Sequence, residues 1–434
     1  MTKEEQVYVF LQREKLTPDK HDGLPDSVTS TIMESRVWSA AWSAVKFVAC
    51  VSVGIGFALT AIYVYKRRRK LFQKYKGMSD IEDFEREARR KLPRFTYALI
   101  AHGTGDKATV EENIAAFQRY NIRKRIMNDF PDLSTTIQDH YVELPVGIGP
   151  SMYRSWLWDE GDLCVSKAAG FLNICEIVPM LSDYSLEEII ESTQNSDAMK
   201  WFQIYICDDG FHETLVRRAE KAGYQGIVVA SGGYGYEDES EGGEWTLAIN
   251  NILDKLTAVR LGNFDDISPA KAFQKHGIRP TTWKDVKRLK SFTNLPMILM
   301  DIVTPKEAKM AMDHDVQGLI VSNEGGKTVD SLHGTLDILP EIVSTVENNT
   351  EVYVYGGVRS GSDVMKALGL GARACFLGRP VLYGLCYQGE EGVIQVLSLL
   401  KNELAKCMSN TGCTSVDEIG SFCVVRSSSF HEDN

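Results

Sequence analysis

The sequence predicts an α/β fold, a (β/α)₈ TIM barrel preceded by an N-terminal transmembrane helix. Three observations lead to this prediction. Eight short apolar segments follow one another after residue 140, amphipathic helical stretches separate them, and one long uncharged segment stands before them all. Short apolar strands that alternate with helices are best accommodated by a parallel sheet that closes on itself. A doubly wound open sheet is the alternative, but no GxGxxG follows the first strand.

Residues 47–65, FVACVSVGIGFALTAIYVY, form the predicted transmembrane helix. Nineteen residues without a charge are enough to cross the hydrocarbon core, and a buried globular helix suits this length and these flanks less well. Residues 1–46 form a polar head, and the juxtamembrane residues 66–77 are strongly basic. Because cations collect on the cytosolic side, we expect a single-pass membrane protein whose barrel, residues 78–424, is cytosolic. Residues 425–434 form a short tail.

Composition narrows the classes of partner. The chain has 434 residues, a net charge of −11 and nine scattered cysteines. An acidic balance argues against nucleic acid as the main partner. With no CxxC pair and no Cys/His spacing suited to a metal, the cysteines read as reduced thiols, and no metal site is predicted.

The barrel strands follow in order, each bounded by turn residues. They are predicted at 145–149, 172–178, 200–206, 226–230, 296–302, 317–321, 351–355 and 373–377. Helices are predicted between them, among others at 212–222, 305–313 and 361–369, and a first helix opens at Ser79 as its N-cap. The interval 232–280 is too long for one loop, so we expect a lid over the barrel mouth within it.

A glycine-rich stretch at residues 353–380 predicts a phosphate site. Two strands run into turns that contain Gly356, Gly357 and Arg359 in the first case, and Gly378 and Arg379 in the second. In a (β/α)₈ barrel these are the loops after strands seven and eight, where phosphate sites recur. Glycine lets backbone N–H groups approach a phosphate closely, and arginine adds a charge-assisted fork. Two tight turns with surface arginines are the alternative interpretation of these residues.

Four segments of the chain are characteristic: WFQIYICDDG, LVRRAEKAGYQGIVV, LIVSNEGGKTVD and YGGVRSGSDVMKALGLGARACFLGRPVLYGL. Through these segments the chain, from about Met78 to Gly420, resembles the FMN-dependent α-hydroxy-acid oxidase and dehydrogenase family. The resemblance implies FMN as cofactor and a small 2-hydroxy acid as substrate. In such enzymes a histidine takes the substrate proton while the flavin accepts the hydride equivalent.

Carried over position by position, the resemblance implies an altered catalytic set. Glu324 stands where the family has its histidine, and Lys327 stands where it has a substrate-binding arginine. The remaining replacements are Met300 for a lysine, Gly232 for an aspartate and Leu99 for a tyrosine, whereas Tyr205 is kept. Losing one member of a catalytic unit commonly removes most of the catalysis.

The implied flavin site is better preserved. Pro150 and Ser151 stand at the flavin-facing turn after the first strand, and Gln203 stands at a flavin-contacting position. The glycines and arginines of the phosphate stretch are also kept, although Tyr355 replaces the usual acid before the glycine pair.

Two functions remain open at this stage. One is a membrane-anchored FMN-binding protein whose 2-hydroxy-acid oxidation is lost or altered. The other is a pseudoenzyme barrel that acts as a ligand-binding or interaction scaffold without flavin. The C-terminal SSSFHEDN lacks a peroxisomal ending, so we expect no residence in the peroxisomal matrix. The resemblance leaves a homo-oligomer open.

Overall fold

The structure is a computed structural model that describes residues 78–125, 131–152, 154–231, 260–264, 272 and 275–427. The predicted head, transmembrane helix and juxtamembrane segment therefore lie outside the described residues. So do Gly232 and most of the interval in which a lid is expected. Among the helices that the structure describes, none combines the length and the apolar character needed to span a membrane.

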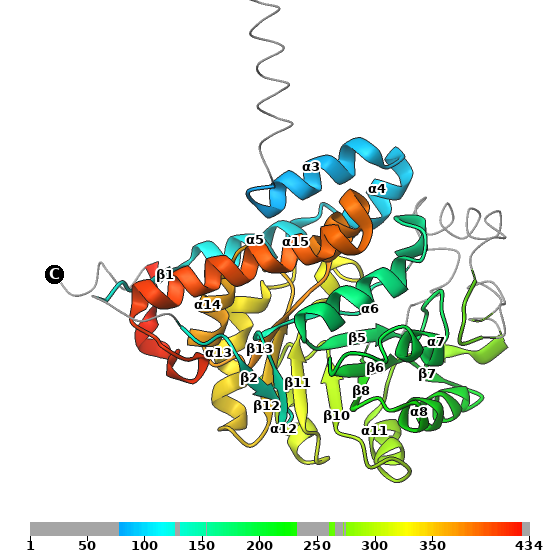
Figure 1. Ribbon diagram of the computed structural model, residues 1–434. Coiled ribbons are helices and arrows are strands. Elements are labelled where there is room, and N and C mark those ends of the chain that lie inside the picture. The colour runs from blue at the N-terminus through cyan, green and yellow to red at the C-terminus, as the bar shows by residue number, and fades with distance from the viewer. Residues whose placement is uncertain are drawn as a thin grey trace, which may run out of the picture. The chain divides into compact units, whose positions relative to one another are not determined.

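Eight parallel strands close into a barrel, which confirms the predicted architecture (Figure 1). In barrel order they are β4 (Val146–Ile148), β5 (Glu176–Pro179), β6 (Lys200–Ile204), β8 (Gly226–Ala230), β10 (Met297–Met300), β11 (Gly318–Val321), β12 (Glu351–Tyr355) and β13 (Ala374–Leu377). β13 pairs with β4 and closes the ring. Most strand residues are buried on both faces, which is why the strands are continuous apolar runs.

The second strand was predicted to begin at residue 172, but β5 begins at Glu176. Residues up to Leu172 belong to α6 (Gly161–Leu172), and Asn173 ends that helix in the left-handed region at φ 48°. Asparagine tolerates this conformation and is a common helix terminator. The apolar residues 172–178 thus divide between a helix end, a turn and the first part of β5.

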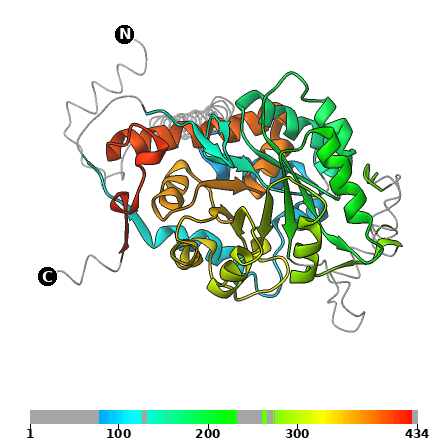
Figure 2. The ribbon, with the colours of Figure 1, turned by 90° about the horizontal axis from the view of Figure 1, so that it is seen from below.

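Helices surround the strands on the outside of the barrel (Figure 2). Those that pack on it are α5 (Ala108–Gln118), α6, α7 (Leu186–Glu191), α8 (Phe211–Ala222), α11 (Trp283–Lys290), α12 (Pro305–Met312), α13 (Thr335–Val346), α14 (Gly361–Gly369) and α15 (Arg379–Thr411). The predicted helices 212–222, 305–313 and 361–369 correspond to α8, α12 and α14.

The chain enters the barrel through two helices, α3 (Ile81–Lys91) and α4 (Arg94–Ala101). α3 packs along α15 (Figure 1). Its N-cap is Asp80, whose carboxylate accepts a hydrogen bond from the Asp83 N–H, and not Ser79 as expected. Ser79 instead donates its hydroxyl to the Asp83 carboxylate at 2.8 Å. Either residue type can cap a helix, and the backbone places Asp80 one position nearer.

The end of the barrel where the strands begin is filled by aromatic side chains. The rings of Trp201, Tyr353 and Phe376 contact one another with centroids 5.4 to 5.8 Å apart. A hairpin of β2 (Thr135–Ile137) and β3 (His140–Val142) lies at this end, and Gln138 in its turn donates to the Tyr353 hydroxyl at 3.0 Å. The interior of the barrel is therefore filled at this end.

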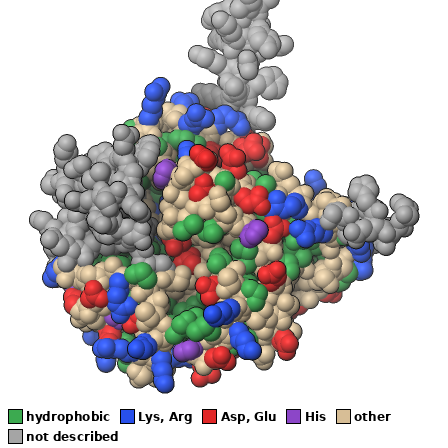
Figure 3. Space-filling model, turned by 180° about the vertical axis from the view of Figure 1, so that it is seen from behind, with side chains coloured by type: hydrophobic (Ala, Val, Ile, Leu, Met, Phe, Trp, Pro, Cys, Tyr) green, Lys and Arg blue, Asp and Glu red, His purple; other side chains and the backbone are tan. Residues whose placement is uncertain are grey.

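Short elements complete the fold. β1 (Tyr120–Ile122) pairs antiparallel with β14 (Val424–Arg426), and β7 (Ile206–Cys207) pairs with β9 (Ile278–Arg279). The 3₁₀ turns are η1 (Arg154–Trp156), η2 (Glu324–Gly326), η3 (Val416–Glu418) and η4 (Ser421–Cys423). On the face seen in Figure 3, acidic, basic and apolar side chains are interspersed. That face offers no basic patch of the kind that binds nucleic acid.

Candidate functional site

The predicted site residues gather at the carboxyl ends of the barrel strands. This end is called the mouth below. Pro150 and Ser151 follow β4, Gln203 lies in β6 and Tyr205 after it, Glu324 and Lys327 follow β11, Gly356, Gly357 and Arg359 follow β12, and Gly378 and Arg379 follow β13. Strand ends of a parallel barrel converge on one face, so residues distant in sequence share one site.

Arg359 is the most favourable anion ligand at the mouth. Its Nη1 donates one hydrogen bond, to the Val358 carbonyl at 2.9 Å. Among the residues that the structure describes, no carboxylate lies within ion-pair distance of its guanidinium. Burial lowers its pKa, and the more distant carboxylates of Glu85 and Asp363 oppose that shift. A partly buried cation without a counter-ion is a costly arrangement that an anionic ligand would relieve.

The glycine pair before Arg359 has a packing reason as well as a binding one. Gly357 adopts φ 82°, and a Cβ added there would lie 2.1 Å from the carbonyl oxygen of Asn113 in α5. Gly356 adopts φ 142°. The turn therefore requires glycine at Gly357 so that β12 can end against α5. Ser360 then caps α14 by accepting from the Asp363 N–H at 3.2 Å, while the Gly361 N–H donates to the Glu403 carboxylate at 2.7 Å.

Arg379 fastens the segments around the mouth to one another. Its guanidinium donates to three carbonyl oxygens, those of Ile100 at 3.1 Å, His102 at 2.8 Å and Gly325 at 3.0 Å. These carbonyls belong to the end of α4 and to the turn after β11. The side chain thus joins the N-terminal cap to the barrel, and its positive charge still faces the mouth beside Arg359.

Two carboxyl groups occupy the ends of neighbouring strands. Asp301 follows β10 and Glu324 follows β11, and both adopt left-handed backbone angles, φ 68° and φ 51°. Ser231 and Ser322 donate hydrogen bonds to the Asp301 carboxyl, but its buried Oδ1 has no partner among the residues that the structure describes. Positive φ in non-glycine residues is strained and concentrates at functional sites. The pair is called the carboxyl pair below.

Electrostatics at the carboxyl pair favour a retained proton. Burial, and then the neighbouring Glu324, raise the pKa of Asp301 to about 8. Burial also raises the pKa of Glu324, while Lys327 opposes that shift. Desolvation and the charge of Arg379 lower the pKa of Lys327, although the residue as a whole stays exposed to solvent. Two like charges this close cannot both ionise cheaply, so near neutrality the pair holds a proton.

Asp301 was not found from the sequence, although a signal was present. The segment MILMD places an acid directly after a buried strand, which is the same pattern that singled out Glu324. Leu99 lies in α4 and Met300 ends β10.

Gln203 and Tyr355 contribute the other polar groups of the mouth. Gln203 is buried, and within the described part of the chain its Nε2 has no hydrogen-bond partner. The Tyr355 hydroxyl donates to the Pro150 carbonyl at 2.8 Å and also hydrogen-bonds with Ser151. Its ring packs so closely that a Cβ at Gly149 would lie 2.3 Å from it. Gln203 therefore offers a free donor, whereas the turn after β4 is held by Tyr355.

A buried ion network supports that turn from behind. Arg154 Nη1 lies 3.2 Å from Asp162 and 3.1 Å from Glu176, and Lys200 Nζ lies 2.9 Å from Glu176. Arg154 also donates to the Gly149 carbonyl at 3.2 Å. Each of these charged groups has an opposite partner, so the network fixes the end of β4 and needs no ligand.

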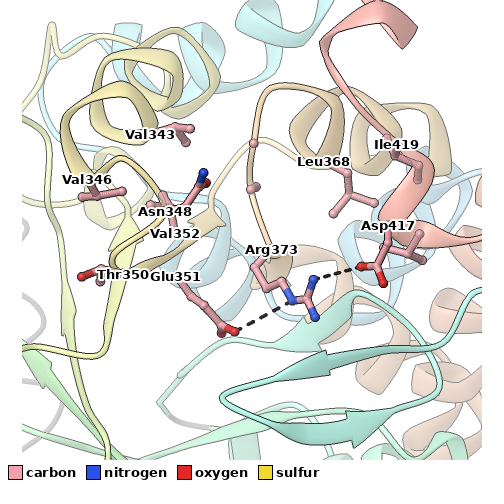
Figure 4. A pocket seen from close by; sticks show the side chains of 13 residues that line it. Val343, Val346, Asn348, Thr350, Glu351, Val352, Leu368, Arg373, Asp417 and Ile419 are labelled. Carbon is pink, nitrogen blue, oxygen red and sulfur yellow. Dashed lines mark hydrogen bonds and ion pairs between the residues drawn. The ribbon is translucent and has the colours of Figure 1, made fainter.

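A cavity of about 340 Å³ lies at the opposite end of the barrel (Figure 4). Arg373 crosses it, 3.1 Å from Asp417 and 3.9 Å from Glu351, and also donates to Thr136. Every charge in this cavity is balanced by the protein. It lies away from the mouth and contains none of the predicted site residues.

Comparisons with known proteins decide the family. Residues 88–426 match the family described as FMN-dependent dehydrogenase. The chain belongs to that family. The resemblance inferred from the sequence is thereby confirmed.

Relatives and solved structures agree with this assignment. Rattus norvegicus 2-hydroxyacid oxidase 2 is 38% identical over 344 residues, 78% of this chain and 96% of that protein. Homo sapiens 2-hydroxyacid oxidase 1 is 35% identical and covers 78% of this chain and 94% of its own length. A mandelate oxidase structure superposes with a TM-score of 0.70 at 32% identity, over 80% of this chain and 98% of that one.

The mouth of this FMN-dependent dehydrogenase family member can hold the family cofactor. FMN combines a phosphate with a ring system that carries hydrogen-bond acceptors. The uncompensated Arg359 suits the phosphate, and the unpartnered Nε2 of buried Gln203 suits an acceptor on the ring. Lys327 and Arg379 add positive charge on the same side. The residues present therefore fit FMN.

Proposed function

We propose that this chain is a membrane-anchored, FMN-binding member of its family in which standard 2-hydroxy-acid oxidation is lost or altered. The observation that carries the proposal is the carboxyl pair, which places a retained proton where such a reaction needs a proton acceptor. FMN when bound supplies a hydride acceptor. The remaining steps fall to this chain's own residues.

Binding of FMN is supported by charge. Arg359 has no carboxylate partner within the described part of the chain, and burial disfavours its charged form. A phosphate at this point would restore the balance and would accept forked hydrogen bonds from the guanidinium. Gln203 would orient the ring by donating from Nε2.

Loss of the usual reaction is supported by the proton state of the mouth. Asp301 with a pKa of about 8 is a proton donor near neutrality, and a general base must be a proton acceptor. Ionised Glu324 would repel an incoming carboxylate substrate. Lys327 offers a point charge in place of the planar two-pronged grip of arginine.

The second candidate function is a scaffold barrel without flavin. It is favoured by Tyr355 and Arg379, whose hydrogen bonds to backbone carbonyls already hold the mouth together. A mouth closed by its own side chains can persist without a ligand. The uncompensated Arg359 weighs against this candidate.

Membrane anchoring with a cytosolic barrel forms part of the proposal. It is supported by the uncharged residues 47–65 and by the basic residues 66–77 that follow. Among structural relatives, one is a soluble mutant of the membrane-associated (S)-mandelate dehydrogenase from Pseudomonas putida, with a TM-score of 0.72 at 25% identity, over 81% of this chain and all of that one.

Absorbance of the purified chain tests the proposal. The full chain, extracted in detergent, should be yellow or should become yellow when FMN is added and the excess removed. A folded, colourless preparation that takes up no FMN would refute FMN binding and favour the scaffold. With flavin bound, glycolate, lactate and longer 2-hydroxy acids should bleach it slowly or not at all under anaerobic conditions. Rapid bleaching by one of these acids would refute the loss of the family reaction.

A restored variant provides the complementary measurement. Met300→Lys, Gly232→Asp and Glu324→His together bring back three of the five replaced family residue types, and the parent chain is the reference. Faster bleaching in the triple variant is the expected result if the replacements caused the loss. Equal rates in the triple variant and the parent would place the cause elsewhere in the mouth.

A further inference from the structure

Two cysteines contact each other near the C-terminal end of the barrel domain. The Sγ atoms of Cys413 and Cys423 lie 3.5 Å apart. Both side chains are buried, with exposed fractions of 2% and 1%. Cys413 directly follows Gly412, which ends α15, and Cys423 directly precedes β14. The described residues contain other free cysteines, but no other sulfur pair is in contact among them.

The backbone on both sides of this thiol pair is held in place. The Cys413 N–H donates to the Met408 carbonyl at 3.1 Å, and the Cys423 N–H donates to the Gly420 carbonyl at 2.8 Å. The Cys423 carbonyl accepts from the Arg123 N–H at 2.9 Å, next to β1. A disulfide needs its sulfurs about 2.0 Å apart. Closing the gap requires a movement of about 1.5 Å, which side-chain rotation and small backbone adjustments can supply.

The loop between the two cysteines is partly exposed to solvent. Residues 414–422 form two single 3₁₀ turns, and Thr414, Asp417, Glu418, Ser421 and Phe422 in it are exposed. An oxidant would reach the two buried thiols by displacing this loop. Cys407, by comparison, is half-buried one and a half turns earlier in α15 and has no contacting sulfur.

We propose that Cys413 and Cys423 form a reversible disulfide site that is oxidised by a low-molecular-weight disulfide such as glutathione disulfide. One cysteine thiolate attacks a sulfur of glutathione disulfide, and the S–S bond of the oxidant breaks to release one glutathione thiolate. The second cysteine thiolate attacks the resulting mixed disulfide and releases the second glutathione. Two cysteine thiols are oxidised, one disulfide is reduced, and the two protons pass to the two glutathione thiolates.

The disulfide would connect the end of one element to the start of another. Cys413 lies two residues after the last residue of α15. Cys423 directly precedes β14, which pairs with β1. Val424 in β14 packs so closely on Gly369, the last residue of α14, that an added Cβ would lie 2.4 Å from its Cγ2. Oxidation therefore ties α15, α14 and β1 together at one point. Because burial raises the pKa of Cys423 to about 11, exchange should quicken as the pH rises.

Peptide mapping after controlled oxidation tests the site. The full chain in detergent is incubated in glutathione buffers of increasing oxidised fraction, free thiols are alkylated, and the protein is digested with trypsin. Cleavage after Lys406 and Arg426 releases one peptide that contains Cys407, Cys413 and Cys423. After oxidation and alkylation, the expected peptide carries one alkyl group, on Cys407, and lacks the two thiol hydrogen atoms of Cys413 and Cys423. Chymotrypsin cleavage after Phe422 should then give two fragments joined by the disulfide.

Single cysteine variants test which thiols form the cross-link. Cys407→Ser is the matched control and should leave the cross-link unchanged. Cys423→Ser should instead trap a glutathione on Cys413. Three alkylated cysteines after oxidation of the native chain, a link that includes Cys407, or a link that forms only in denaturant would each overturn the proposal. Reduction with dithiothreitol should restore all three free thiols, and failure to do so would refute reversibility.

Discussion

Replacing Asp301 with asparagine tests whether the Asp301 carboxyl keeps its proton in the folded chain near neutral pH. Asn has the same shape and can still accept hydrogen bonds from Ser231 and Ser322 through its side-chain oxygen. Its amide can donate toward Glu324 in place of the proton. The substitution therefore keeps the packing and removes the titration.

The magnitude follows from the raised pKa. Asp301 keeps its proton up to about pH 8 in the folded chain and loses it near pH 4 when unfolded. Between these values the folded state binds more protons, so the free energy of unfolding falls as pH rises, by at most about 1.4 kcal/mol per pH unit. The side chain keeps some solvent contact, so we expect about half of this slope. Below pH 4 the contribution disappears.

Urea unfolding at pH 5 and pH 7, followed by tryptophan fluorescence, measures the effect. The stability of Asp301→Asn relative to the native chain should rise by about 1–2 kcal/mol between the two pH values. Asp330→Asn is the matched control. The Asp330 carboxylate accepts the Thr109 N–H, its pKa is about 2, and it stays ionised over this range. Equal stability differences for Asp301→Asn at both pH values would refute the retained proton.

Three further changes address the phosphate corner and the mouth. Arg359→Gln should weaken FMN binding about 10–100-fold, measured by quenching of flavin fluorescence, without lowering the stability of the ligand-free chain. A loss of ligand-free stability would contradict an uncompensated cation. Gly357→Ala should lower the free energy of unfolding by about 2–4 kcal/mol, because its Cβ would meet a carbonyl of α5 at 2.1 Å. Gly210→Ala, which has a positive φ but open space, should cost only about 1 kcal/mol, and equal costs would contradict the steric explanation. Lys327→Met should raise the pKa of Glu324 further, seen as a carboxyl infrared band that titrates at higher pH. An unshifted band would show that their charges do not interact.

The barrel was predictable because its strands are buried on both faces. Such strands appear in the sequence as continuous apolar runs between turns, and all eight were found. The boundary of β5 was missed because α6 ends in Leu172 and a left-handed Asn173, so that helix and strand share one apolar run. The N-cap of α3 was missed because Ser79 and Asp80 are both good caps and the backbone decides between them.

The residues that form the mouth could be predicted from the sequence, but the contacts between them could not. The residue types at Arg359 and Glu324 were read from their position after a strand. The bonds of Arg379 to Ile100 and His102 depend on how α4 meets the barrel, a contact between residues nearly 280 positions apart. The raised pKa of Asp301 depends on burial and on a neighbour from another strand. Such long-range geometry leaves no pattern in a single sequence.

The uncompensated charge of Arg359 links the lifetime of the chain to its cofactor. A ligand that binds only the folded state adds a free energy that grows with the logarithm of its concentration, about 2.7 kcal/mol at one hundred times the dissociation constant. A phosphate bound at this corner would stabilise the folded chain in this way, because it would pair with the positive charge of Arg359. Newly made chains in a riboflavin-starved cell would then be the ones that unfold and are degraded. The abundance of the protein would follow flavin supply, whether or not a hydride is ever transferred.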